Sequence, residues 1–213
     1  MGGPTTFWDF CAPFYDLAEK TNGRAYGEML KTVKTLVPQG ASVLEVAAGT
    51  GSISVAVAGK ARSVLCTDIS ERMLKIARRK TANFGHVTVE KRSVFDLGKP
   101  DGAYDVVVAG QVLHLIDEPD KAAAELRRVA NSMVILPMSF TKNLRGTAKL
   151  GLGVYRLFGF APKIELDADD YAKFLPSIGF EDCEHIQIAG KIPMAVAVWN
   201  KRTGEEIKYG NDA

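Results

Sequence analysis

Short runs of apolar residues alternate with apolar stripes at helical spacing through most of this chain. The runs predict strands at 43–46, 63–67, 87–90, 104–109 and 132–136. The stripes predict helices at 52–59, 70–80 and 119–130, and Ser70 is a suitable N-cap for the second of them. Because strands and helices alternate, we expect a parallel sheet with helices on both faces.

The two ends of the chain depart from this alternation. Residues 7–36 have helical spacing interrupted near Pro13 and Asn22, which predicts two helices before the first strand. The acidic run 167–170 predicts the cap of a helix over 171–178. Apolar runs at 180–189 and 192–200 flank a Gly-Lys turn and predict an antiparallel hairpin.

The first predicted strand leads into a loop of small residues. Glu45 lies near the strand's end, Gly49 and Gly51 follow, and the next helix begins at once. Glycines let the backbone approach a ligand closely, and free N–H groups at a helix start favour an anion. Asp68 ends the next strand, where a ribose hydroxyl pair is held in nucleotide-binding sheets. The layout therefore predicts a nucleotide-like ligand.

This succession of motifs, from Val43 to Leu136, resembles the class I S-adenosylmethionine-dependent methyltransferases, especially their small-molecule and lipid-directed members. The resemblance implies an α/β fold: a Rossmann-like, doubly wound, mostly parallel seven-stranded sheet whose last two strands are the C-terminal antiparallel hairpin. It also implies one domain over 1–213, with a helical lid (1–40), a cofactor-binding core (41–139), a variable substrate-lid region (140–178) and the hairpin (179–202).

The resemblance also implies where S-adenosylmethionine, and its product S-adenosylhomocysteine, would bind. The family's loop pattern is an acid followed by three alternate glycines, and Ala47 here replaces the first glycine. The loop would lie beneath the methionine portion, Asp68 would hold the ribose, and Ile69 with Met73 would cover the adenine. The full set implied is Tyr15, Glu45, Ala47, Gly49, Thr50, Gly51, Asp68, Ile69, Met73, Ser93, Val94, Phe95, Gly110 and Gln111.

Two positions in this set carry alternatives. Ser93 stands where the family has an aspartate, so a hydroxyl would accept from the adenine amine while the Val94 N–H donates to the ring. Asp96 is a possible substitute, although we expect it to cap a turn. Tyr15 would lie near the cofactor's carboxylate, or it is an amphipathic residue that packs a helix on the core.

Methyl transfer from a sulfonium needs alignment of the reacting atoms and exclusion of water more than it needs acid–base groups. His114, just beyond the fourth strand, is the one histidine placed to act as a general base, and its alternative role is packing beside the pocket. His86 and His185 are expected to be structural or solvated.

The variable region, residues 140–162, is expected to determine which methyl acceptor binds. Lys142, Arg145 and Lys149 are expected on one helical face beside an apolar stretch, an arrangement that suits an anionic amphiphile. The simpler interpretation is an ordinary lid helix with its charges in water. A second basic group, Lys75 to Lys80, is explained by a solvated helix end.

Composition narrows the partners and the compartment expected for this chain. The net charge of +2 gives no reason to expect nucleic-acid binding. Three scattered cysteines suit a reducing, cytoplasmic compartment and argue against a zinc site, so no metal is expected. The apolar runs are too short for a transmembrane segment, which leaves peripheral membrane contact possible. Oligomeric state is left open.

Two other functions stay open on the sequence. One is a cofactor-binding protein without chemistry, acting as a sensor or an assembly partner, because methyl transfer demands no diagnostic side chain. The other is an NAD(P)-dependent oxidoreductase. It fits less well, because Ser54 occupies the third glycine position of its fingerprint and its fold lacks the C-terminal hairpin.

Overall fold

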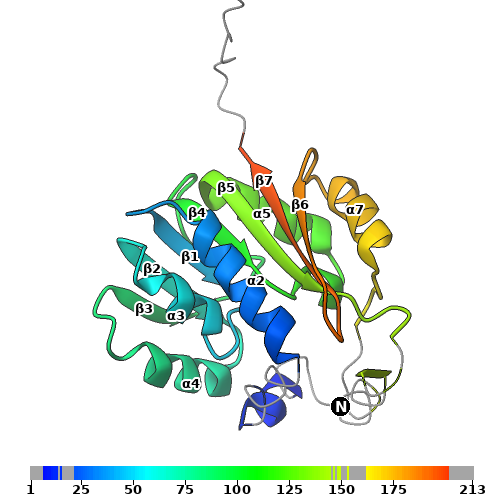
Figure 1. The fold of residues 1–213 in the computed structure, drawn as a ribbon. Coiled ribbons are helices and arrows are strands. Elements are labelled where there is room, and N and C mark those ends of the chain that lie inside the picture. Colours follow the sequence, from blue (N-terminus) through cyan, green and yellow to red (C-terminus); the bar gives the residue numbers. More distant parts are fainter. Residues whose placement is uncertain are drawn as a thin grey trace, which may run out of the picture.

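Seven strands form a single sheet in a computed structural model that describes residues 7–13, 15, 22–144, 146, 148–149, 153 and 162–201. The strand order is β3-β2-β1-β4-β5-β7-β6 (Figure 1). The strands are β1 (Ser42–Val46), β2 (Ser63–Asp68), β3 (Val87–Lys91), β4 (Tyr104–Ala109), β5 (Ala130–Ser139), β6 (Glu184–Ile188) and β7 (Met194–Asn200).

Helices cover both faces of this sheet. They are α2 (Gly23–Leu36), α3 (Ser52–Ala58), α4 (Glu71–Thr81), α5 (Pro119–Val129) and α7 (Ala168–Ser177), with the short 3-10 helix η1 (Leu113–Leu115) after β4. In Figure 1, α2 and α3 cross in front of the sheet, and α5 lies behind it. Residues 7–13 and 15 are also helical, and we call them the N-terminal segment.

The pairing of the strands confirms the expected fold class. β1 to β5 are parallel neighbours, whereas β7 is antiparallel to both β5 and β6. The strand order reverses between β1 and β4. In open sheets of this kind, ligands bind outside the carboxyl ends of the strands at such a switch point.

Alternate residues of the strands enter two separate apolar clusters. Val43, Val64 and Val106 pack beneath α2 and α3. Leu44 and Leu65, one position along, pack in the cluster that includes residues of α5 and α7. Because both faces are buried, the central strands read as continuous apolar runs rather than as an alternation with polar residues.

The structure differs from the predicted elements mainly around β5 and the hairpin. β5 continues past the predicted end at 136, through Pro137, to Ser139. Proline is tolerated there because β4 has ended, and the Pro137 carbonyl instead accepts from the Gln111 N–H at 3.0 Å. The hairpin strands begin later than predicted, at Glu184 and Met194.

Other expectations at the ends are confirmed in part. Asp167 caps α7 in a capping box with Asp170, and α7 starts at Ala168, slightly earlier than predicted. Within the described part of the chain, no helix is both long and apolar enough to span a bilayer.

Candidate functional site

The loop after β1 is held by backbone contacts to β2. The Ala48 N–H donates to the Thr67 carbonyl at 2.9 Å, and the Gly49 N–H donates to Asp68 Oδ2 at 2.8 Å. Gly51, with φ at 76°, is the residue before α3. The loop therefore lies at the carboxyl edge of the sheet and leads directly into the N-terminus of a helix.

Both glycines of the loop allow close approach of other groups. A Cβ on Gly51 would lie 3.1 Å from the Ala77 Cβ, so this glycine lets α3 begin close against α4. A Cβ on Gly49 would lie 3.6 Å from Cε1 of Tyr15, which places the Tyr15 ring next to the loop. Both have positive φ, a conformation that glycine adopts at little cost.

Ala47 adopts a left-handed conformation, with φ at 53°. This is the position where the resembling family carries a glycine. The loop therefore keeps the backbone geometry of the pattern and places an alanine in a conformation that a Cβ disfavours.

Glu45 is buried beneath the loop rather than exposed at its surface. Its Oε2 accepts from the Ser54 N–H at 2.7 Å and also from the Ser54 hydroxyl. Ser54 is the residue at the third glycine position of the dinucleotide fingerprint, and here its side chain joins α3 to β1. The sequence pattern drew attention to Ser54 only as a departure from that fingerprint, so this contact was missed.

Asp68 links the loops that follow β1 and β2. Its Oδ2 accepts from the Gly49 N–H, as described above, and its Oδ1 accepts from the Ser70 N–H at 2.8 Å. The residue is only 8% exposed, and burial raises its pKa, while the backbone N–H groups act in the opposite direction. A carboxylate oxygen has a second lone pair, so Asp68 can still accept from ligand hydroxyls.

The start of α4 follows the sequence prediction. Ser70 is its N-cap, and the Ser70 hydroxyl accepts from the Met73 N–H at 3.1 Å. Ile69 is partly exposed beside it, whereas Met73 is almost fully buried. Of the two residues expected against the adenine, Ile69 is the more accessible.

The loop after β3 is closed by its own side chains. The Ser93 hydroxyl accepts from the Phe95 N–H at 3.2 Å. Asp96 Oδ1 accepts from the Gly98 N–H at 3.1 Å, which confirms that Asp96 caps a turn. Val94 is buried, and Phe95 is 44% exposed.

The end of β4 is fixed to the extended end of β5. Gln111 has a positive φ of 57°, its side-chain amide donates to Ser139 Oγ at 3.0 Å, and its Oε1 accepts from the Ser139 N–H at 2.9 Å. A Cβ on Gly110 would lie 3.4 Å from Ile53 Cδ1, so this glycine lies close to α3. Gly110 and Gln111 thus lie on the same edge as the glycine loop.

His114 lies in η1 and is 6% exposed. Burial lowers its pKa to about 4, so the imidazole is neutral at physiological pH. Its Nδ1 has no hydrogen-bond partner among the residues that the structure describes. The His114 carbonyl accepts from the Lys163 and Ile164 N–H groups at 3.0 and 3.2 Å, which attaches the chain before α7 to this turn.

Two basic groups differ from their expected settings. Lys80 does not simply face water, because its Nζ donates to the Thr50 and Ser52 hydroxyls at 3.1 and 2.9 Å and ties the end of α4 to the glycine loop. Lys142 lies outside any helix, and its ammonium pairs with Asp170 and, at 3.4 Å, with Asp167. The expected helical face of Lys142 with Arg145 and Lys149 is therefore wrong at Lys142.

Lys149 is helical and exposed. Arg145 and the apolar stretch 154–160 lie outside the described residues, and so do residues 1–6 and 202–213.

The carboxyl edge therefore brings together most of the predicted positions. The glycine loop, Asp68, the Ser93 loop and the Gly110–Gln111 turn line it, while Glu45 and Met73 lie in the layer beneath. The arrangement fits an adenosyl ligand on two observations. Glycines occupy positions where a Cβ would fill the space beside Tyr15 and Ile53, and a buried carboxylate is held at the strand tip by backbone donors. The described residues contain no group of three or more His, Cys, Asp or Glu side chains placed to hold a metal ion.

Comparison with known proteins finds methyltransferases among the relatives of this chain. Residues 43–132 match the family model described as a methyltransferase domain. The chain is 33% identical over 153 residues to the ubiquinone/menaquinone biosynthesis C-methyltransferase UbiE of Burkholderia mallei, covering 67% of this chain and 61% of that protein. It is 35% identical over 99 residues to the demethylmenaquinone methyltransferase of Clavibacter sepedonicus, covering 46% of this chain and 40% of that protein. The chain thus matches less than two thirds of each relative's length.

Solved structures share the fold at lower identity. Magnesium protoporphyrin IX methyltransferase (ChlM) from Synechocystis PCC 6803, with bound S-adenosylhomocysteine, has a TM-score of 0.65 and 20% identity, over 86% of this chain and 87% of that one. The [4+2]-cyclase SpnF has a TM-score of 0.66 and 18% identity, over 84% and 82%. A protein named for a cyclisation therefore shares this fold, so the fold alone does not fix the reaction.

Proposed function

We propose that this chain, which belongs to the class I S-adenosylmethionine-dependent methyltransferases, transfers a methyl group from S-adenosylmethionine to a small-molecule acceptor. The observation that carries the proposal is Asp68 at the tip of β2, with its carboxylate held by the Gly49 and Ser70 N–H groups. These contacts join the glycine loop to the start of α4 and leave lone pairs for two ribose hydroxyls.

The other residues of the site have roles that follow from their positions. The backbone of the glycine loop would approach the methionine portion, with the Tyr15 ring beside it. Ile69 would pack on the adenine, and the Val94 N–H with the Ser93 hydroxyl would meet its edge. The backbone acceptors of Gly110 and Gln111 would face the amino group of the cofactor's methionine portion. Glu45 would act from beneath, by fixing α3 through Ser54.

When bound, S-adenosylmethionine supplies a methyl group already activated on a positively charged sulfur. The protein's part is to orient the acceptor in line with that methyl group and to exclude water. His114 would accept a hydrogen bond or a proton from the acceptor, because its imidazole is neutral and its Nδ1 has no described partner. With a pKa of about 4 the imidazole is a weak base, so the role that fits it better is to orient an acceptor hydroxyl by accepting its hydrogen bond.

The class of acceptor follows from the relatives' names. Two of them act in quinone biosynthesis, and a structural neighbour acts on a porphyrin. We propose an apolar, aromatic or quinone-type acceptor, with a hydroxyl that His114 could orient. We also propose a cytoplasmic location with peripheral access to membrane-borne substrates, in keeping with the three unpaired cysteines. No nucleic-acid partner is proposed.

Calorimetric titration with S-adenosylhomocysteine, with NADH as the competing ligand, tests the cofactor assignment. We expect micromolar binding of S-adenosylhomocysteine alone. Asp68→Ala should weaken that binding by about 100-fold, because it removes charged acceptors for two hydroxyls. The matched control is Asp96→Ala, which removes a turn carboxylate on the same edge and should leave affinity unchanged. Equal losses in the two variants would overturn the ribose assignment, and NADH binding alone would favour an oxidoreductase.

Incubation with methyl-labelled S-adenosylmethionine and a panel of hydroquinones and porphyrins separates an enzyme from a silent binder. Transfer of label to one acceptor, with equal formation of S-adenosylhomocysteine, supports catalysis. Tight cofactor binding without transfer to any acceptor of the panel favours the sensor or assembly role.

A further inference from the structure

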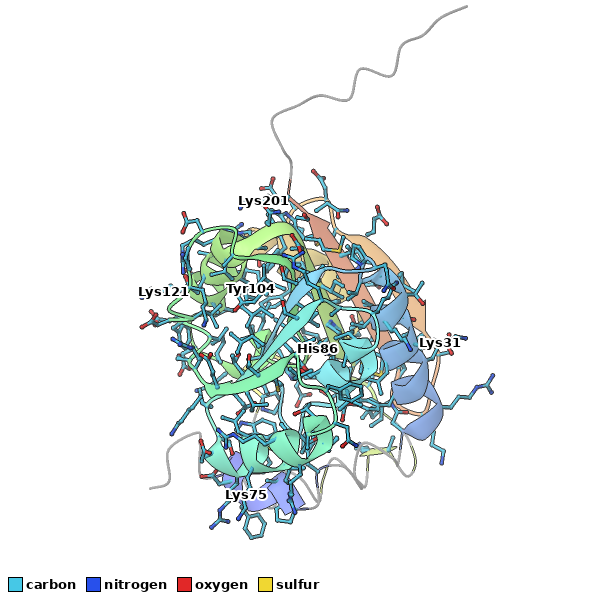
Figure 2. All side chains as sticks on the ribbon, turned by 90° about the vertical axis from the view of Figure 1, so that its left-hand side faces the viewer. Lys31, Lys75, His86, Tyr104, Lys121 and Lys201 are labelled. Carbon is cyan, nitrogen blue, oxygen red and sulfur yellow. The ribbon has the colours of Figure 1, made fainter. Side chains whose placement is uncertain are left out.

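The N-terminal segment contacts both loops that frame the proposed cofactor site. At one point, the Ser70 hydroxyl donates to Asp9 Oδ1, and Arg72 Nη1 donates to the Asp9 carbonyl at 3.4 Å. At the other, the Tyr15 ring lies beside Gly49. Figures 1 and 2 both show the segment, dark blue in Figure 1 and paler in Figure 2, at the same end of the molecule as α4, which carries Lys75.

Ser70 is the residue through which the segment reaches the site. Its N–H donates to Asp68, its oxygen accepts from the Met73 N–H, and its single hydroxyl proton is directed to Asp9. Ser70 is almost completely buried. A hydroxyl has only one proton to give, so the Asp9 carboxylate sets the orientation of a side chain that also holds the start of α4.

Part of the N-terminal segment is buried, whereas Phe10 and Pro13 are exposed. Cys11 and Ala12 are buried, and Trp8 makes edge-on ring contacts with Phe7 and Tyr15, at 4.9 and 6.2 Å between centroids. Asp9 is next in sequence to Trp8, whose ring contacts Tyr15, and Cys11 and Ala12 between Asp9 and Tyr15 are buried. We therefore expect a change at Asp9 to alter the position of Tyr15.

The contact between the N-terminal segment and Ser70 brings two like charges close together. The carboxylates of Asp9 and Asp68 lie on either side of Ser70. The Asp9 charge raises the pKa of Asp68, although burial raises it more. Attraction in the contact comes from the shared hydroxyl and from Arg72. Ribose hydroxyls would bring new donors to Asp68 and would offset this repulsion, so the contact should be stronger when the cofactor is bound.

We propose that Asp9 is a positioning residue whose carboxylate latches the N-terminal segment, and with it Tyr15, over the bound cofactor through Ser70. This inference rests on the proposed function, because it names the device that retains the ligand of that same site. It predicts that loss of the latch increases the rate of cofactor release while the rest of the fold is unaffected.

The two tryptophans of the chain make this testable, because Trp8 is in the segment and Trp199 is at the end of β7. In a Trp199→Phe background, Trp8 is the only tryptophan, and its emission reports the segment alone. We expect Asp9→Ala, which removes the acceptor of the Ser70 hydroxyl, to increase the rate of S-adenosylhomocysteine release by about tenfold, the factor for one charged hydrogen bond, as followed by stopped-flow displacement. The dissociation constant should rise by a similar factor, with the ligand-free Tm unchanged.

Glu71→Ala is the matched control. Glu71 is an exposed carboxylate next to Ser70 in sequence, and it pairs with Arg78 rather than with the segment. This variant should keep the release rate of the parent protein. An unchanged release rate in Asp9→Ala, or an equal increase in Glu71→Ala, would overturn the latch.

If S-adenosylhomocysteine does not bind the parent protein at all, the latch can still be tested by acrylamide quenching of Trp8 emission in the ligand-free protein. That result would remove the proposed function. Stronger quenching in Asp9→Ala than in the parent would still support the latch, whereas equal quenching would refute it.

Discussion

Ala47 is the residue at which this chain departs most clearly from the glycine pattern, and its backbone remains in the left-handed region, with φ at 53°. An L-residue with a Cβ is less stable there than glycine by about 1–2 kcal/mol, whereas glycine loses about 0.5–1 kcal/mol more backbone entropy on folding. We therefore expect Ala47→Gly to stabilise the protein by about 0.5–1 kcal/mol, measured as the free energy of unfolding in urea.

Ala48→Gly is the control for this substitution. Ala48 is adjacent, does not have a positive φ, and its N–H is bonded to Thr67. Only the entropic loss applies there, so the variant should be less stable by about 0.5–1 kcal/mol. If both glycine variants lose stability equally, strain at Ala47 is not the reason for the difference.

His114 makes the stability of the fold sensitive to acid. Burial lowers its pKa from 6.5 to about 4, so the unfolded chain binds a proton between these values that the folded protein does not. Stability is then lost as pH falls from 6.5 towards 4, by up to about 3 kcal/mol from this residue. The free energy of unfolding of the parent protein should therefore fall between pH 7 and pH 4.5. In His114→Gln, denaturation at the two pH values should show a fall that is smaller by about 2–3 kcal/mol.

His86→Gln serves as the comparison, because His86 lies directly before β3, where its ring bonds to the Ala58 carbonyl at the end of α3, whereas His114 lies after the carboxyl end of β4. With His114 intact, it should retain the acid-dependent loss of the parent protein. Equal pH dependence in His114→Gln and the parent would show that the imidazole is not kept neutral by the fold.

At the scale of elements, the sequence predicted those whose signals are local. The strands β1, β2 and β4 and the helix α4 lie within a residue or two of their predicted bounds, because apolar periodicity and the Ser70 cap specify them without distant partners. The late end of β5 had no such signal. Pro137 reads as the end of a strand, and only pairing with β7 and the Gln111 contact extends it.

Contacts between elements were not accessible from the pattern. Lys80 reads as one of several cations in the last turn of a helix, and nothing in its spacing connects it to Thr50, 30 positions earlier. Glu45 matches a family motif, but its contact with Ser54 depends on how α3 turns over β1. Periodicity specifies which face of an element is buried, whereas such side-chain pairs depend on the distance between packed elements.

At the scale of the molecule, the place of the site could be predicted because it follows from topology. Parallel strands end at one edge of the sheet, so the loops after β1, β2, β3 and β4 meet there whatever their detailed contacts. The acceptor could not be predicted in the same way, because methyl transfer requires alignment rather than a diagnostic side chain. The Asp9 contact was also missed, since 61 positions separate it from Ser70.

The N-terminal segment can be tested as a part separate from the sheet. Neither apolar cluster includes a described residue before Ala25, and Asn22, whose side chain bonds to the Ile192 backbone, remains in a chain that starts at position 22. We expect deletion of residues 1–21 to leave a cooperative thermal transition by circular dichroism. It should weaken S-adenosylhomocysteine binding by about tenfold or more, because both the Ser70 and the Gly49 contacts are lost. A truncated chain without cooperative unfolding would instead make the segment part of the folding core, and unchanged affinity would show that it does not cover the ligand.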